Sequence, residues 1–227
     1  MGDLAVPRAE DGLAPDRRLT RAGLDVWEWG PEDGRTLLFV HGLGEAGPTS
    51  AEEAGPRWGG AGFRVVAPAE PGWFGSPLLD EEEYALSRLA ARLLETVDEP
   101  PVWVGFSWGG MVGVHAPPER LRGLVLLDGG YFDTDKRPED EVEERYRRAR
   151  IGIRAEQPST AWPRLAASGL PVLLLACDEE RVPPQLEAFR RGVPRAEVEQ
   201  LPGSLHNLLT SARDETIERV AAWAAAH

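Results

Sequence analysis

One serine in the chain stands in a setting that favours nucleophilic chemistry. Residues 105–109 read Gly-Phe-Ser-Trp-Gly, a G-x-S-x-G pattern, and they follow directly on the apolar run 102–106. A serine on a sharp strand-to-helix turn has strained backbone dihedrals, and side chains two residues to either side would collide with it. Glycines at both positions remove that collision and leave the hydroxyl accessible. We therefore predict that Ser107 is a catalytic nucleophile.

A second glycine-rich turn can serve the same reaction. Residues 41–44 read His-Gly-Leu-Gly and follow the apolar run 37–40. A turn there can direct the Leu43 backbone N–H toward the carbonyl that Ser107 attacks, and the Trp108 N–H supplies a second donor. Two such donors form an oxyanion hole, in which each is worth about 2.7–4 kcal/mol of the barrier. We interpret His41 as a histidine that orients the backbone of this turn.

The elements that position these residues follow from the hydrophobic pattern. Apolar runs without alternation occur at residues 37–40, 63–67, 102–106, 124–127 and 170–176. Such runs are typical of parallel strands buried on both faces. Helical periodicity occupies residues 86–97 and 212–226, and residues 19–29 resemble a hairpin at a sheet edge. The predicted fold class is α/β, a doubly wound, mostly parallel sheet with helices on both faces.

The predicted domain organisation is simple. One domain covers residues 18–227, after an N-terminal arm at residues 1–17 that is rich in Pro, Asp and Arg. Residues 131–167 interrupt the alternation of strands and helices. They predict a small helical cap over the C-terminal edge of the sheet, where ligands bind in open α/β folds.

Taken together, the motifs resemble those of the α/β-hydrolase superfamily, in its serine-hydrolase branch. The H-G-x-x-G-like turn, the G-x-S-x-G serine and Pro-Gly-Trp-Phe-Gly-Ser at residues 71–76 occur in that family's order. The resemblance covers residues 24–223. It implies a serine hydrolase that works through a Ser-His-acid triad and an acyl-enzyme, with no metal and no organic cofactor.

The resemblance also implies where the general base and the acid stand. The family order is serine, then acid, then histidine, which selects His206 among the four histidines because it follows the last strand. Glu180 occupies the usual acid position after the run 170–176, and Asp178 and Glu179 are its neighbours. Asp128, at the end of the preceding strand, is the alternative acid. An acid in either place must orient the imidazole and stabilise its positive charge.

One departure from the family pattern bears on activity. Pro117 and Pro118 stop the helix after Ser107 about one turn earlier than is usual in relatives. A short helix leaves fewer packed residues behind the nucleophile. A catalytically degenerate hydrolase fold that only binds a ligand is therefore an alternative function.

Aromatic side chains suggest the substrate class. Five of them lie in segments expected to converge above Ser107 and to line an apolar pocket: Trp73, Phe74, Tyr131, Phe132 and Trp162. The predicted substrate is a small or medium, largely apolar ester, lactone or amide. Cofactor-free perhydrolysis and C–C bond hydrolysis are alternative reactions of the same triad.

The composition of the chain indicates which classes of binding partner are disfavoured. The 227 residues carry a formal net charge of −13, which disfavours nucleic acid and anionic lipid as partners. A single cysteine, Cys177, excludes an intramolecular disulfide, and Cys and His do not cluster as in a zinc site. No apolar stretch approaches the ~20 residues of a membrane span, and the N-terminus lacks signal-peptide features. We expect a cytoplasmic protein whose partner is a small-molecule substrate; the oligomeric state stays open.

Overall fold

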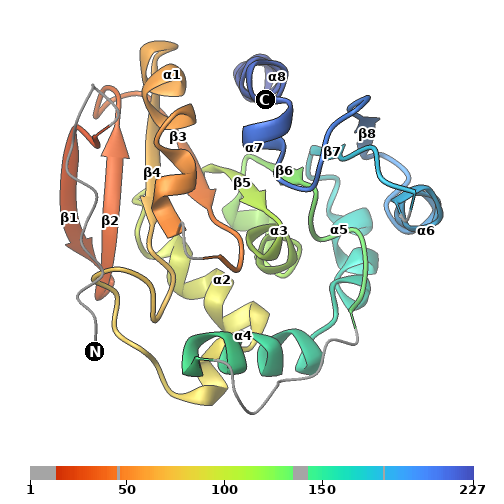
Figure 1. The fold of residues 1–227 in the computed structure, drawn as a ribbon, viewed down its shortest axis with the longest axis horizontal. Coiled ribbons are helices and arrows are strands. Elements are labelled where there is room, and N and C mark those ends of the chain that lie inside the picture. The colour runs from red at the N-terminus through yellow and green to blue at the C-terminus, as the bar shows by residue number, and fades with distance from the viewer. Residues whose placement is uncertain (1–13, 45–46, 135–142, 181) are drawn as a thin grey trace.

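The strands form one mostly parallel sheet. The computed structural model describes residues 14–44, 47–134, 143–180 and 182–227. In this part of the chain, eight strands pair in the order β1-β2-β4-β3-β5-β6-β7-β8 (Figure 1). Their bounds are β1 (Arg17–Arg21), β2 (Leu24–Trp29), β3 (Arg35–Val40), β4 (Phe63–Pro68), β5 (Val102–Phe106), β6 (Gly123–Leu127), β7 (Val172–Ala176) and β8 (Glu197–Gln200).

The pairing confirms the predicted fold class. Strands β4, β3, β5, β6, β7 and β8 run parallel, whereas β2 is antiparallel to both β1 and β4. Every residue of β5, β6 and β7 is buried, which explains their uninterrupted apolar sequences. Strand β8 has the polar sequence Glu-Val-Glu-Gln and lies at the sheet edge, so hydrophobicity did not reveal it.

Helices cover both faces of the sheet. Helices α1 and α8 pack together on one face, and α2, α3 and α5 lie on the other (Figure 1). Their bounds are α1 (Ala54–Gly60), α2 (Leu86–Leu94), α3 (Trp108–Gly113), α4 (Glu144–Ala155), α5 (Trp162–Ser168), α6 (Val182–Gly192), α7 (Leu208–Ser211) and α8 (Arg213–Ala226). Four 3-10 helices complete the described elements: η1 (Gly47–Ala51), η2 (Glu81–Tyr84), η3 (Pro118–Arg120) and η4 (Pro158–Thr160).

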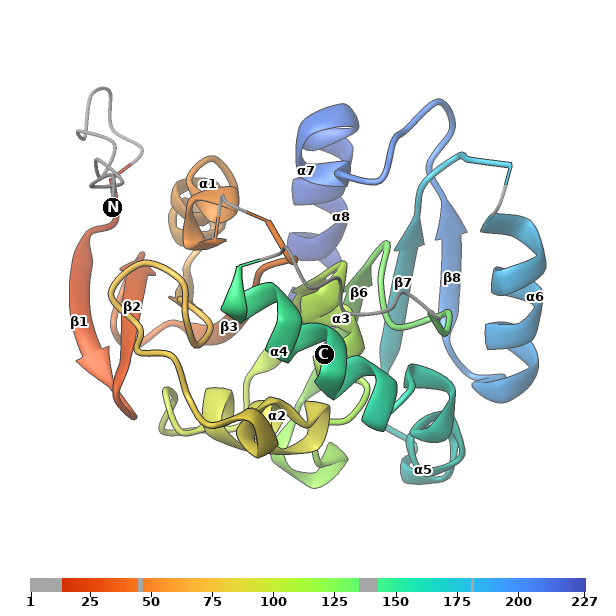
Figure 2. The ribbon, with the colours of Figure 1, turned by 60° about the horizontal axis from the view of Figure 1, so that its bottom comes forward.

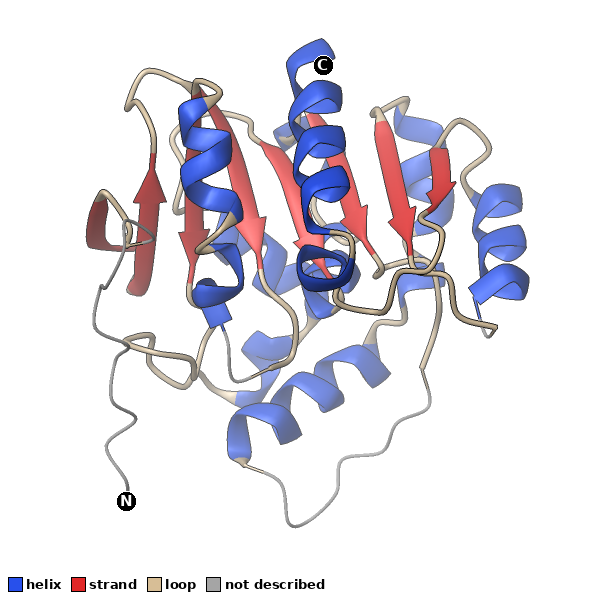
Figure 3. Cartoon of the chain, turned by 45° about the horizontal axis from the view of Figure 1, so that its top comes forward, coloured by secondary structure: helices blue, strands red, loops and turns tan. Residues whose placement is uncertain are grey.

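Helix α4 crosses the sheet at the carboxyl ends of the parallel strands (Figures 2 and 3). The Arg145 guanidinium lies 5.2 Å from the ring centre of Trp73 and 5.0 Å from that of Tyr146, an arrangement for cation–π attraction. Gly152 allows close contact with η2, because a Cβ atom there would lie 1.8 Å from the Tyr84 carbonyl oxygen. The helix therefore sits at the edge of the sheet where the predicted cap was expected.

Some residues of the predicted N-terminal arm and of the predicted cap lie outside the described residues. These are residues 1–13 of the predicted arm and residues 135–142 of the predicted cap. Strand β1 begins at Arg17, within the predicted arm. No helix among the described residues combines the length and the apolar character that crossing a bilayer would demand.

Candidate active site

Ser107 occupies a strained turn between β5 and α3. Its backbone has φ 51° and ψ −110°, a conformation that residues other than glycine rarely adopt. A Cβ atom at Gly105 would lie 2.4 Å from the Gly109 carbonyl oxygen, and one at Gly109 would lie 2.1 Å from that of Val40. Both glycines of the pattern are thus required by close backbone contact, which is the physical reason the sequence suggested.

The helix behind the serine is short but fully packed. Helix α3 has six residues, as the prolines at 117 and 118 predicted, and all six are buried. The Trp103 indole N–H donates to the Gly109 carbonyl at 3.1 Å, and the Ser107 N–H donates to the Leu127 carbonyl at 2.9 Å. These bonds attach the turn to β5 and β6.

His206 lies beside the serine. The Ser107 hydroxyl is 2.9 Å from His206 Nε2, and the Phe106 ring packs on the imidazole at a centroid distance of 5.3 Å. The two residues stand 99 positions apart in the sequence. They meet because β5 and the loop after β8 end at the same edge of the sheet.

The loop that carries His206 is held by hydrogen bonds to its neighbours. The Gly203 N–H donates to Asp178 Oδ2 at 2.9 Å, and the Asp178 N–H donates to the Ser204 carbonyl at 3.1 Å. The Leu205 N–H donates to the Ser211 hydroxyl at 2.9 Å. Asp178, one of the acidic neighbours of Glu180, thus anchors the histidine loop.

The carboxylate against the imidazole belongs to Asp128, the alternative acid of the sequence analysis. His206 Nδ1 lies 2.5 Å from Asp128 Oδ2, and the Asp128 side chain is fully buried. Glu180, the acid that the sequence favoured, lies on an exposed turn four residues beyond the end of β7. Strand β6 is the direct neighbour of β5, so a residue at its end stands next to Ser107, whereas β7 is one strand farther away.

Asp128 is set up to remain ionised. Its Oδ1 accepts hydrogen bonds from the Tyr131 hydroxyl at 2.7 Å and from the Cys177 N–H at 3.1 Å, and its Oδ2 faces His206. Burial raises the pKa of Asp128, but the hydrogen bonds from His206, Cys177 and Tyr131 outweigh it and hold the pKa below its ordinary value. An ionised Asp128 requires a proton on His206 Nδ1, which leaves Nε2 free to accept the Ser107 proton.

A cavity of about 620 Å³ opens onto these groups. Ser107 and His206 line it together with Leu43 and Trp108, the residues predicted to supply the oxyanion hole. The Trp108 N–H belongs to the first turn of α3, where backbone N–H groups have no partner within the helix. The remaining lining residues are Met111, Phe132, Thr134, Tyr146, Arg150, Ile153 and Glu179.

Only one of the five aromatic side chains predicted for the pocket lines this cavity, namely Phe132. Trp73 and Tyr131 are fully buried, and Trp73 packs against Trp108 with a centroid distance of 5.5 Å. Phe74 packs edge-on against Trp27, and Trp162 packs edge-on against Phe189. These four rings therefore support the cavity wall or the core.

Helix α4 contributes three side chains to the cavity that were not predicted from the sequence. Tyr146, Arg150 and Ile153 line the cavity from one side of this helix, at spacings of four and three residues. That spacing marks one helical face, so the pattern was available in the sequence. The cap was predicted at residues 131–167, but the side of the helix that lines the cavity was not identified.

His41 has the backbone-orienting role that the sequence suggested. Its Nδ1–H donates to the Gly42 carbonyl at 2.9 Å, and its Nε2 accepts the Glu70 N–H at 3.1 Å. These two bonds require a neutral imidazole. Burial lowers the pKa of His41 to about 4, which keeps the ring neutral.

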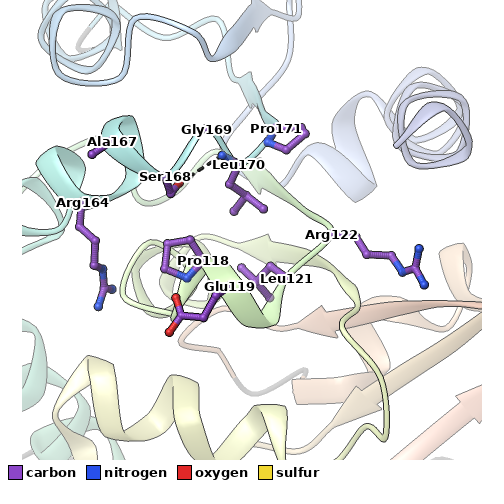
Figure 4. Close-up of a pocket in the computed structure, with 10 residues that line it drawn as sticks. All are labelled: Pro118, Glu119, Leu121, Arg122, Arg164, Ala167, Ser168, Gly169, Leu170 and Pro171. Atoms are coloured by element: carbon purple, nitrogen blue, oxygen red, sulfur yellow. Dashed lines mark hydrogen bonds between the residues drawn. The ribbon is translucent and has the colours of Figure 1, made fainter.

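A second cavity, of about 640 Å³, lies at the opposite edge of the sheet (Figure 4). Its lining includes Leu121 just before β6 and Pro171 just before β7, so it faces the amino ends of these strands. No group of three or more His, Cys, Asp or Glu side chains with metal-binding spacing occurs among the residues that the structure describes. Ser107 and His206 both line the first cavity, whereas the described lining of the second has neither histidine nor cysteine.

Comparisons with known proteins agree with this fold. Over 112 residues the chain is 33% identical to a protein named epoxide hydrolase A from Mycobacterium tuberculosis; the match covers 46% of this chain and only 34% of that protein. The fold is similar to that of an esterase from Exiguobacterium antarcticum, with TM-score 0.72, 14% identity, and coverage of 91% of this chain and 98% of the esterase. It is also similar to a monoacylglycerol lipase from Paleococcus ferrophilus, with TM-score 0.70, 20% identity, and coverage of 90% and 99%.

The family itself follows from a match to the sequence profile described as "Alpha/beta hydrolase family". The profile matches residues 37–164, more than half of the chain. This range contains the turn at Leu43, the serine at 107 and the acid at 128. The chain therefore belongs to the alpha/beta hydrolase family.

Proposed function

We propose that this protein is a serine hydrolase that cleaves a small or medium, largely apolar carboxylic ester, lactone or amide through an acyl-enzyme. The observation that carries the proposal is the unbroken hydrogen-bonded chain from Ser107 through His206 to Asp128 at the wall of a cavity. The two distances, 2.9 and 2.5 Å, are those of groups that share protons.

The reaction begins with proton transfer from Ser107. His206 Nε2 takes the hydroxyl proton as the oxygen attacks the carbonyl carbon, and Asp128 stabilises the imidazolium that forms. The N–H groups of Leu43 and Trp108 receive the developing oxyanion. His206 then protonates the leaving group, and water activated by the same imidazole hydrolyses the acyl-enzyme.

The cavity supports the substrate class. Its volume, about 620 Å³, lies within the range of small-molecule sites. Leu43, Met111, Phe132 and Ile153 give it apolar walls that suit an acyl chain. The polar side chains of Thr134, Arg150 and Glu179 give it a section that suits the oxygen or nitrogen atoms of a substrate.

Epoxide opening, which the name of the curated relative suggests, suits this nucleophile poorly. A serine alkoxide that attacks an epoxide carbon forms an ether, and neither an oxyanion hole nor an activated water cleaves an ether. A carboxylate nucleophile would form an ester that water can hydrolyse, but a serine stands at position 107. Attack on a carbonyl carbon is therefore the reaction that Ser107 can complete.

The proposal is tested with p-nitrophenyl acetate and butyrate. Wild-type protein should hydrolyse both, and Ser107→Ala should lower kcat by about 10⁴-fold or more, because the acyl-enzyme cannot form. Ser168→Ala is the matched control, since Ser168 lies in the cavity at the opposite edge of the sheet (Figure 4). Equal rates for Ser107→Ala and wild type would contradict the proposal. Two further assays test the alternative reactions of Ser107 and His206: formation of a peracid tests perhydrolysis, and cleavage of a β-diketone tests C–C bond hydrolysis.

A further inference from the structure

The turn that follows β6 brings a tyrosine back onto the acid of the site. Residues 128–131 read Asp-Gly-Gly-Tyr, and both Asp128 and Gly130 have positive φ, 45° and 75°. This tight turn places the Tyr131 hydroxyl 2.7 Å from Asp128 Oδ1. Tyr131 is fully buried, so the hydroxyl is removed from water and directed at the carboxylate.

The two oxygens of Asp128 have different partners. Oδ1 accepts from Tyr131 and from the Cys177 N–H, whereas Oδ2 faces His206. Two donors on Oδ1 fix the rotation of the carboxylate about its Cβ–Cγ bond, and that rotation decides where Oδ2 points. Without the Tyr131 hydroxyl, Oδ1 loses the shorter of these two hydrogen bonds and keeps the one from the Cys177 N–H at 3.1 Å.

We propose that Tyr131 is a positioning residue of the reaction, whose hydroxyl orients Asp128 so that its other oxygen holds His206 in the catalytic geometry. The inference rests on the proposed function, because Asp128 matters to catalysis only if His206 is the general base. It assigns to Tyr131 a role in proton transfer, in place of the pocket-lining role that the sequence suggested.

The chain offers a matched pair of variants for this test. Tyr131→Phe removes the hydroxyl and keeps the ring, which packs edge-on against Phe132 at 4.9 Å. Tyr84→Phe removes the hydroxyl of another fully buried tyrosine, which donates to the Pro71 carbonyl at 2.9 Å. Both variants lose one buried hydrogen bond, but only Tyr131 is bonded to the acid of the site.

We expect Tyr131→Phe to lower kcat for p-nitrophenyl acetate about tenfold with KM unchanged, since a hydrogen bond to a charged group is lost. The acidic limb of its kcat/KM–pH profile should move to higher pH, because a carboxylate with fewer donors attracts a proton to the neighbouring imidazole more strongly. Tyr84→Phe should change neither quantity. Wild-type kcat and an unmoved profile in Tyr131→Phe would overturn the inference.

A double-variant cycle shows whether Tyr131 acts through Asp128. If it does, adding Tyr131→Phe to Asp128→Asn should cost less than twofold, because the carboxylate that the hydroxyl orients is already gone. Losses that multiply in the double variant would assign the hydroxyl a role independent of Asp128 and would contradict the proposal.

A spectroscopic measurement keeps the inference separate from the proposed activity. Proton NMR should show a far-downfield resonance from His206 Nδ1–H that is absent in Asp128→Asn. Tyr131→Phe should shift this resonance, and Tyr84→Phe should not. An inactive wild-type protein would refute the proposed function, yet the shift would still report the contact; a resonance unmoved by Tyr131→Phe would refute the positioning role.

Discussion

Two histidines of this protein each face a buried carboxyl group, and the two pairs behave in opposite ways. His206 lies 2.5 Å from Asp128, whereas His41 Nδ1 lies 3.6 Å from Glu70 Oε2. Both carboxyl groups are fully buried. The chemical types are therefore the same, and the surroundings make the difference.

The pair at the cavity is built to carry charge. Three donors surround the Asp128 carboxylate, and they hold its pKa below the ordinary value in spite of burial. The His206 side chain is 42% exposed and lines the cavity, so solvent reaches it.

The pair of His41 and Glu70, which follow β3 and β4, stays neutral. His41 is only 1% exposed, and both of its ring nitrogens are used by backbone groups. Neither Glu70 carboxyl oxygen has a hydrogen-bond partner among the described residues, and burial raises the pKa of Glu70 well above its ordinary value. The two pairs differ in the number of donors around the carboxyl group and in the exposure of the ring, and these differences distinguish the histidine proposed as general base from the one that orients backbone.

The largest expected effect, a loss of kcat, comes from changing the pair of His206 and Asp128. Asp128→Asn should lower kcat for p-nitrophenyl acetate by about 10⁴-fold, because an amide favours the wrong tautomer of His206. The measurement is steady-state hydrolysis with protein shown to be folded by circular dichroism.

Glu180→Gln is the matched control, and its kcat should stay within twofold of wild type because Glu180 is exposed. A large loss in Glu180→Gln together with a mild one in Asp128→Asn would reverse the assignment of the acid.

A smaller effect is expected from changing the pair of His41 and Glu70, and it concerns the free energy of unfolding. Above pH 4.5, the ordinary pKa of a glutamate, Glu70 loses its proton in the unfolded chain but keeps it in the folded protein, where its pKa is raised. The stability of wild type therefore falls as the pH rises toward the folded-state pKa of Glu70. Glu70→Gln removes that dependence. The free energy of unfolding of Glu70→Gln, relative to that of wild type, should therefore increase by about 1.4 kcal/mol for each pH unit, until the pH exceeds the folded-state pKa of Glu70. Urea unfolding between pH 4.5 and 8 measures the difference.

His41 provides an internal check on that measurement. Its pKa is lowered from 6.5 to about 4, so the stability it contributes is present above pH 6.5 and is lost as pH falls toward 4. Its slope opposes that of Glu70 between pH 4.5 and 6.5. Stability should therefore rise more steeply with pH in Glu70→Gln than in wild type over this interval. Parallel curves for the two proteins would show that Glu70 is ionised in the folded state.

The sequence predicted those parts of the molecule that local crowding and burial dictate. The runs that became β3, β4, β5, β6 and β7 are apolar because both faces of these strands are covered. The glycines around Ser107 are required by backbone contacts of 2.1 and 2.4 Å, and that requirement shows in the sequence. Fold class and the candidate nucleophile were predictable for these reasons.

The parts that depend on how strands are arranged were not predictable in the same way. Glu180 and Asp128 both follow buried strands, and only the position of β6 beside β5 brings Asp128 close to Ser107. Trp73 and Trp162 lie in segments expected to converge above Ser107, but Trp73 is fully buried against Trp108 and Trp162 packs edge-on against Phe189. Glu70 could not be recognised from the sequence, because a buried carboxyl group without a hydrogen bond is visible only in three dimensions.

Covalent labelling with a fluorophosphonate tests most directly whether the hydroxyl at position 107 is an activated nucleophile. Intact-mass analysis and peptide mapping should find a single adduct, on Ser107, that forms at least 100-fold more slowly in His206→Ala. Absence of an adduct on Ser107, or equal labelling of wild type and His206→Ala, would contradict a catalytic role for the pair.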